Sequence, residues 1–151
     1  MEHLEYEIQI TAPVKTVWDA MLQKPTYEKW VAVSWPNSSY EGKWAKGEKV
    51  KFIGPEGSGT LADLKVVDPY KKLLAKHIAV LLPGGIEDRT SDGARGWIGT
   101  TEEYQFSEKD GITTVKVLIG TAPEWRKMFD DGWPAALAEL KRIAEDQLVT
   151  T

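Results

Sequence analysis

The sequence predicts a single α+β domain spanning residues 1–151, in which a curved antiparallel sheet of about six or seven strands wraps around a long C-terminal helix. Three observations lead to this prediction. Residues 4–30 have the pattern of one strand followed by two short helices. Residues 39–120 contain strand and turn patterns almost throughout. A tryptophan-led helical segment, DGWPAALAELKRIAED, then follows near the end of the chain. An antiparallel sheet of this length can curl around the terminal helix and leave a pocket between them.

The first strand is predicted by alternation. Apolar side chains at Leu4, Tyr6, Ile8 and Ile10 alternate with polar ones, as a strand with one buried face requires. The period then changes from two to that of a helix, and the first helix has one apolar face: Val14, Val17, Trp18, Met21 and Leu22.

Two prolines mark the starts of the two short helices. Pro13 suits the first helical position, where its missing N–H is not needed. Pro25 ends the first helix and can open the second, which places Tyr27, Trp30 and Val31 on one side.

Between residues 39 and 120 the strands are separated by turn signals. The turns are expected at Lys46-Gly47, at Gly54–Gly59, at Asp68-Pro69 and, most strongly, at Asp110-Gly111, which is typical of a tight hairpin. The segment Pro83–Gly96 has four glycines and no apolar period, so we expect one long loop there. Loops of this length are either functional lids or disordered, and the sequence leaves both possibilities open.

The C-terminal helix has a candidate capping box, in which Thr121 caps the helix and Glu124 lies three residues on, with Pro123 in the first turn. Gly132 and Pro134 are expected to interrupt or restart the helix. Its predicted apolar stripe is Trp133, Leu137, Leu140, Ala144 and Leu148.

Composition excludes several classes of function. The formal net charge of −4 and the dispersed Lys and Arg disfavour nucleic-acid binding. No cysteine is present and the two histidines are far apart, so a metal site is disfavoured and no cofactor is predicted. The longest apolar run, Ile78–Leu82, cannot span a membrane, and no signal peptide is recognisable, so we expect a cytoplasmic protein without membrane insertion, as a monomer or homodimer.

Several segments together resemble a known family. The stretches APVKTVWDAM…YEKW, Val67-Asp68-Pro69, TEEYQFSEKDGITTVKV and Gly132-Trp133 occur in the order seen in the START-like (SRPBCC, helix-grip) superfamily, the fold of birch pollen allergen. Within it, the chain is most similar to the family named for the C-terminal domain of the activator of the heat-shock protein 90 ATPase. The sequence departs from that pattern in a longer Val31–Tyr40 segment and in Pro134. The resemblance implies a helix-grip fold with a cavity between sheet and last helix, commonly used for apolar or amphipathic small molecules.

Seven tryptophans are too many to pack into one core of this size. Trp18 lies on the apolar face of the first helix and is predicted to be a core residue. We predict that the others, with nearby aromatic and polar residues, include the ligand-binding set: Trp30, Trp35, Trp44, Phe52, His77, Glu102, Tyr104, Trp125, Phe129 and Trp133.

Two polar members of this set have alternative interpretations. Glu102 shares the face of Tyr104 by the strand period, so it is either a ligand anchor or acid/base, or a residue at the wet end of the strand paired with Arg89 or Arg95. The ion pair is the preferred interpretation. For His77, a hydrogen-bonded structural role is preferred over that of a catalytic base.

No nucleophile–base–orienter set is visible, so no catalytic residue is predicted. The leading hypothesis is a non-enzymatic protein that binds a small apolar or amphipathic molecule, in a stress-response or regulatory setting. The first alternative is an enzyme of the cyclase or hydrolase type that uses polar residues of the cavity. The second is a chaperone-accessory protein that interacts with a heat-shock protein 90-type partner.

Overall fold

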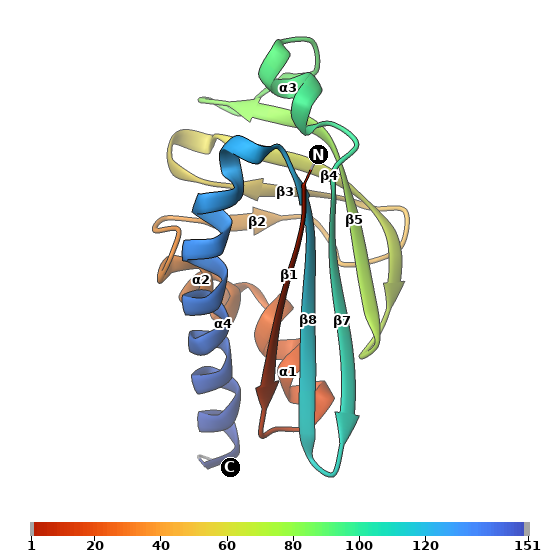
Figure 1. Cartoon of the computed structure of the whole chain (residues 1–151), viewed down its shortest axis with the longest axis vertical. Helices are drawn as coiled ribbons and strands as arrows, with labels where there is room; N and C mark the ends of the chain where they lie inside the picture. Colours follow the sequence, from red (N-terminus) through yellow and green to blue (C-terminus); the bar gives the residue numbers. More distant parts are fainter. Residues whose placement is uncertain (1, 150–151) are drawn as a thin grey trace.

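The computed structural model describes residues 2–149, and these residues form one antiparallel sheet packed against helices at both ends of the chain (Figure 1). The elements in chain order are β1 (Glu2–Ile10), α1 (Val14–Leu22), α2 (Lys24–Ala32), β2 (Ser39–Glu41), β3 (Lys49–Ile53), the 3-10 helix η1 (Pro55–Gly57), β4 (Gly59–Asp68), β5 (Lys72–Leu82), β6 (Ile86–Asp88), α3 (Asp92–Trp97), β7 (Thr101–Lys109), β8 (Ile112–Thr121), the 3-10 helix η2 (Pro123–Trp125) and α4 (Arg126–Val149).

The strands pair in the order β1-β8-β7-β5-β4-β3-β2, and β6 pairs with the end of β5 outside this path. Every pairing is antiparallel. The curled sheet holds α4, which packs against β1, α1 and α2 (Figure 1). The predicted α+β class, curled antiparallel sheet and long C-terminal helix are therefore confirmed.

Local patterns place most elements correctly. In β1, Leu4 and Ile10 are buried while the glutamates between them are exposed, as alternation predicted. Asp110 and Gly111 both have positive φ angles, 54° and 78°, which is the backbone of a tight hairpin joining β7 to β8. Pro25 lies in the first turn of α2, and Pro13 is the residue directly before α1.

The prediction of one long loop at Pro83–Gly96 is wrong, because this segment contains β6 and most of α3. Short-range hydrogen bonds order it. The Ser91 side chain accepts from the backbone N–H of Ala94 and so caps α3, while the Asp88 carboxylate accepts from the Ser91 hydroxyl at 2.5 Å. All the groups in these bonds lie within residues 88–94, which explains why no apolar period in the sequence indicated them.

The predicted capping box at Thr121 is also wrong. Thr121 is the last residue of β8 and pairs with Glu2 of β1, and the 3-10 helix that follows has no side-chain cap. Nor do Gly132 and Pro134 interrupt the last helix, since α4 runs unbroken from Arg126 to Val149 with Pro134 inside it. The predicted stripe is buried from Trp133 to Ala144, and the Leu148 side chain lies outside the described part of the chain.

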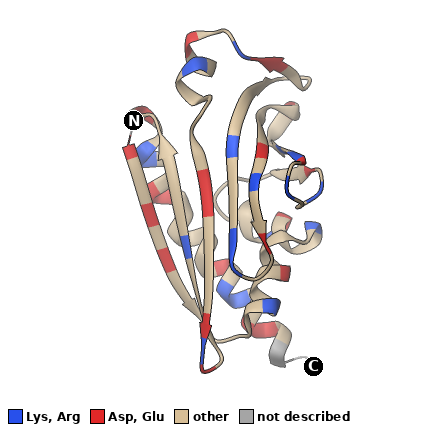
Figure 2. Ribbon diagram, turned by 90° about the vertical axis from the view of Figure 1, so that its right-hand side faces the viewer, with Lys and Arg blue, Asp and Glu red and all other residues tan. Residues whose placement is uncertain are grey.

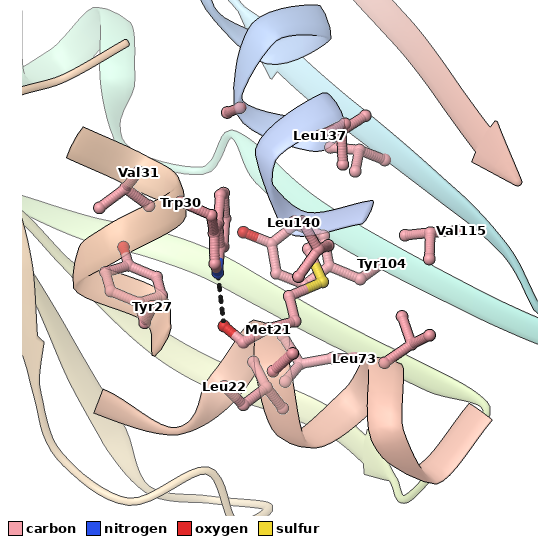
Figure 3. Packing of buried hydrophobic residues seen from close by; sticks show 14 of the residues in the cluster. Met21, Leu22, Tyr27, Trp30, Val31, Leu73, Tyr104, Val115, Leu137 and Leu140 are labelled. Carbon is pink, nitrogen blue, oxygen red and sulfur yellow. Dashed lines mark hydrogen bonds between the residues drawn. The ribbon is translucent and has the colours of Figure 1, made fainter. Parts of the chain in front are cut away.

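The core lies between the sheet and helices α1, α2 and α4. Trp18 belongs to it as predicted, being 9% exposed and packed edge-on against Phe106. Figure 3 shows Trp30 in this core, where its indole N–H donates to the carbonyl of Met21 at 3.2 Å.

Charged side chains are spread over the strands and helices without forming a basic stripe (Figure 2). Salt bridges such as Arg126–Glu2 and Lys116–Glu5 lie on this outer surface. Within residues 2–149, no helix is long and apolar enough to cross a membrane.

Candidate functional site

A pocket of about 630 Å³ lies where the sheet, α2 and the first half of α4 meet. Its walls come from α2 and the segment after it, from β3, the η1 turn and the start of β4, from β5, α3 and β7, and from the residues between η2 and Trp133. This volume is in the range of small-molecule sites. The lining is dominated by aromatic and other apolar side chains, with few polar groups.

Nine of the ten residues proposed from the sequence for ligand contact line this pocket: Trp30, Trp35, Phe52, His77, Glu102, Tyr104, Trp125, Phe129 and Trp133. Trp44 does not. Its indole N–H donates to the Leu22 carbonyl at 3.1 Å, and its ring packs against the rings of Tyr40 and Phe52. The structure therefore places Trp44 in support of the pocket wall instead of in its lining.

Trp133 is the centre of the aromatic wall. Its ring contacts those of Trp30 at 5.8 Å, Trp35 at 5.5 Å and Tyr104 at 6.0 Å, which brings together α4, α2, the segment after α2, and β7. The neighbouring Gly132 makes this packing possible, because a Cβ atom there would lie 2.5 Å from Cζ2 of Trp35. The glycine that seemed to break the helix instead lets an indole lie against its backbone.

Glu102 is the one acidic residue among the described residues that line the pocket. Glu102 lies deep in the protein but is only partly buried. Because it lines the pocket, its accessible surface faces the pocket. The Tyr104 hydroxyl donates to Glu102 Oε2 at 2.6 Å. Burial raises the pKa of this carboxyl to about 7, against the opposing effect of the Tyr104 hydrogen bond.

The ion pair preferred for Glu102 from the sequence is wrong. Arg89 pairs with Glu87, at 3.2 Å, and within residues 2–149 no Lys, Arg or His forms a salt bridge with Glu102. Arg95 lies in α3, which extends from the end of the sheet and gives the pocket Trp97 instead. The sequence could not show this, because the direction of α3 depends on the turn that precedes it.

Two tyrosines flank the carboxyl. Burial raises the pKa of Tyr104 well above its ordinary value, and the nearby Glu102 carboxylate raises it further. Burial also raises the pKa of Tyr27, and the nearby Glu102 carboxylate raises it further, by a smaller amount. Both phenols are therefore neutral hydrogen-bonding groups at physiological pH.

His77 lies 4% exposed between the rings of Phe52 and Trp97, at centroid separations of 6.1 and 5.0 Å. Burial lowers the pKa of His77 to about 4, so the imidazole is neutral near pH 7. Its Nδ1 atom has no hydrogen-bond partner among the described residues. The hydrogen-bonded structural role preferred from the sequence is therefore wrong for Nδ1.

Two further buried polar atoms have no partner within residues 2–149: Nε1 of Trp97 and Nε1 of Trp133. All three unpartnered atoms belong to residues that line the pocket. A buried polar group without a hydrogen bond costs about 1–3 kcal/mol. Such groups are rare in folded proteins, and their concentration around one pocket distinguishes it from an ordinary packing defect.

Three further residues line the pocket that were not predicted from the sequence: Tyr27, Trp97 and Met128. Tyr27 shares the buried face of α2 with Trp30, so a stricter use of that helical face would have included it. Trp97 ends α3 inside a segment predicted to be a loop, and Met128 precedes the predicted apolar stripe. No pattern in the sequence singled out these two.

The described residues hold no group of three or more His, Cys, Asp or Glu side chains that could bind a metal ion. The pocket has an aromatic wall, a buried carboxyl with a pKa near neutrality, and three lining residues whose buried polar atoms have no partner among the described residues. This arrangement suits the binding of an organic molecule.

A curled antiparallel sheet holding a long C-terminal helix defines the START-like, helix-grip class of proteins. Residues 11–145 match the family described as Activator of Hsp90 ATPase homolog 1-like protein, and the chain belongs to this family. The resemblance stated from the sequence is thereby confirmed. A comparison with curated proteins gave no match.

Solved structures share the fold at low sequence identity. A protein from Mesorhizobium loti is 17% identical with a TM-score of 0.72, and the match covers 96% of this chain and 98% of that one. The Aha1 dimer from Colwellia psychrerythraea is 19% identical with a TM-score of 0.69, covering 96% and 97%. DynU16, a putative protein in the dynemicin biosynthetic locus, is 17% identical with a TM-score of 0.70, covering 96% of this chain and 48% of that one.

Proposed function

We propose that this protein binds a small, largely apolar or amphipathic molecule in the pocket between the sheet and α4. The observation that carries the proposal is the coincidence of an aromatic-lined pocket with three buried polar atoms that lack partners. A ligand that fills the pocket would cover aromatic surface, and a shift of the lining side chains would bring its polar atoms to the buried unpartnered ones.

The proposal is tested by titrating the purified protein with lipids, polyketides and aromatic compounds while following tryptophan fluorescence. Five of the seven tryptophans line the pocket, so occupancy should change the emission strongly: Trp30, Trp35, Trp97, Trp125 and Trp133. We expect saturable binding of at least one class, at one molecule per chain. Native mass spectrometry of freshly purified protein would also detect a ligand that copurifies. The absence of saturable binding by every class would contradict the proposal.

A second candidate, an enzyme of the cyclase or hydrolase type, is favoured by one observation. Glu102 has a pKa of about 7, is hydrogen-bonded to Tyr104 and faces the pocket, which are properties of a general acid or base. Once a ligand is known, incubation with the protein followed by mass spectrometry decides between the candidates. Recovery of the ligand unchanged supports the binding protein, whereas a product whose formation is lost in Glu102→Gln supports the enzyme.

A further inference from the structure

Within residues 2–149, the pocket lining can carry a negative charge but no positive one near neutral pH. Among the described residues that line it, Glu102 is the only side chain that can carry a full charge near neutral pH. No Lys or Arg of the described chain joins it there. Bringing a second negative charge close to a buried carboxylate is unfavourable, so an anionic ligand would be disfavoured.

Four aromatic side chains that line the pocket with Glu102 are in contact with one another. The ring centroids of Tyr27 and Trp30 are 5.2 Å apart. Those of Trp30 and Trp133 are 5.8 Å apart, and those of Trp133 and Tyr104 are 6.0 Å apart. The first and last rings of this series belong to the two residues that interact with Glu102. Tyr104 does so by a hydrogen bond and Tyr27 electrostatically. The Glu102 carboxyl therefore lies next to the two tyrosines at the ends of this series of rings, and the two tryptophans between them line the same pocket.

A carboxylate that shares a pocket with Trp and Tyr rings has the chemistry that recognises organic cations. The faces of Trp and Tyr rings attract ammonium groups, more strongly when water is excluded, and the carboxylate supplies the counter-charge. From this geometry we infer that the preferred ligand carries an organic ammonium group, placed against Glu102, with an apolar body in the rest of the pocket. The inference rests on the proposed function and specifies its ligand class.

Other titratable groups near Glu102 do not compete with such a cation. From β7, Tyr104 is neutral, as is Tyr27 from α2, because burial raises the pKa of each. From β5, burial keeps His77 neutral above about pH 4. The pocket residues from α4, which are Met128, Phe129 and Trp133, carry no charge, and the residue opposite Glu102 on β8 is Ile119.

The test uses three probes of equal chain length: decyltrimethylammonium below its micellar concentration, decanol and decanoate. Binding to the full-length protein is measured at pH 8 by tryptophan fluorescence and calorimetry. We expect the ammonium probe to bind at least about tenfold more tightly than decanol, and decanoate most weakly. In Glu102→Gln the ratio of the affinity for the ammonium probe to the affinity for decanol should fall below about threefold. The matched control Glu103→Gln, on the opposite face of β7 beside Lys72, should keep the wild-type ratio.

A second measurement needs no variant. At pH 7, binding of the ammonium probe to the wild-type protein should release protons, because the cation favours the ionised form of Glu102, whereas decanol binding should not. Equal affinity for the ammonium probe and decanol, an ammonium preference retained in Glu102→Gln, or the absence of proton release would each overturn the inference while leaving pocket binding intact. Failure of all three probes and of the wider ligand classes would overturn the proposed function as well.

Discussion

The Tyr104 hydroxyl donates a 2.6 Å hydrogen bond to Glu102 Oε2, two residues earlier on the same face of β7. This bond favours the ionised carboxylate, yet burial outweighs it and raises the pKa of Glu102 from 4.5 to about 7. The folded protein therefore holds this proton more tightly than the unfolded chain does. The contribution to stability is fully present below about pH 4.5 and is lost as pH rises through 7.

Replacing Glu102 by Gln removes this titration and keeps a hydrogen-bonding side chain of the same shape. Between pH 5 and pH 8, the free energy of unfolding of Glu102→Gln should rise relative to that of the wild type by about 2–3 kcal/mol. Urea denaturation of both proteins at the two pH values measures this difference, with Glu103→Gln as the control on the outer face. A difference that stays constant with pH would contradict the burial of the carboxyl.

His77 has the opposite pH dependence. Burial lowers its pKa from 6.5 to about 4, so its contribution is fully present above about pH 6.5 and is lost as pH falls through 4. His77→Phe keeps an aromatic ring between Phe52 and Trp97 and cannot be protonated. Lowering the pH from 8 to 5 should increase the stability of this variant relative to the wild type by about 2 kcal/mol. The same urea experiments test it, and a relative loss of stability at pH 5 would show that the imidazole is charged in the folded protein.

Sequence patterns predicted those parts of the fold that depend on neighbouring residues. Alternation in β1, the Asp110-Gly111 hairpin and the proline at the start of α2 are local, and the structure has all three. The capping box failed because Thr121 is held by pairing with Glu2, at the other end of the chain. Short-range signals give no information about such a partner.

The same distinction applies to the pocket. Aromatic content pointed to its lining, since nine of the ten proposed residues lie there, but the partner of Glu102 could not be read from the sequence. The strand period placed Glu102 and Tyr104 on one face, yet the alternative of an arginine partner depended on where α3 would lie. Pro134 stays within α4 because packing of the buried stripe offsets its cost of about 3 kcal/mol.

Gly132 allows the Trp35 indole to lie against α4, so Gly132→Ala should disturb the pocket wall. The added Cβ would lie 2.5 Å from Trp35, and this overpacking should outweigh the gain of about 1 kcal/mol from better helix propensity. We expect a net loss of about 1–2 kcal/mol, a change in tryptophan emission and weaker ligand binding. Gly96→Ala is the matched control in α3, where nothing lies within 4 Å of the added atom. Equal stability of the two variants would contradict the contact with Trp35.

Trp30 and Trp133 form a matched pair for testing the unpartnered indole. Both line the pocket and are almost fully buried, at 1% and 3% exposure. Trp30 Nε1 donates to the Met21 carbonyl, whereas Trp133 Nε1 has no partner among the described residues. Replacement by Phe removes the same atoms at each position, so the difference between the two variants reports the hydrogen bond.

In ligand-free protein, Trp30→Phe should therefore lower the free energy of unfolding by about 1–3 kcal/mol more than Trp133→Phe does. Urea denaturation at one pH is sufficient, because neither residue titrates. The difference in unfolding free energy between the two variants should narrow when a ligand is added whose hydrogen-bond acceptor reaches Trp133 Nε1, which needs the lining side chains to shift because this atom is buried. If Trp133→Phe lowers the unfolding free energy more than Trp30→Phe does without ligand, the prediction is wrong. The Trp133 indole N–H would then already be hydrogen-bonded in the ligand-free protein.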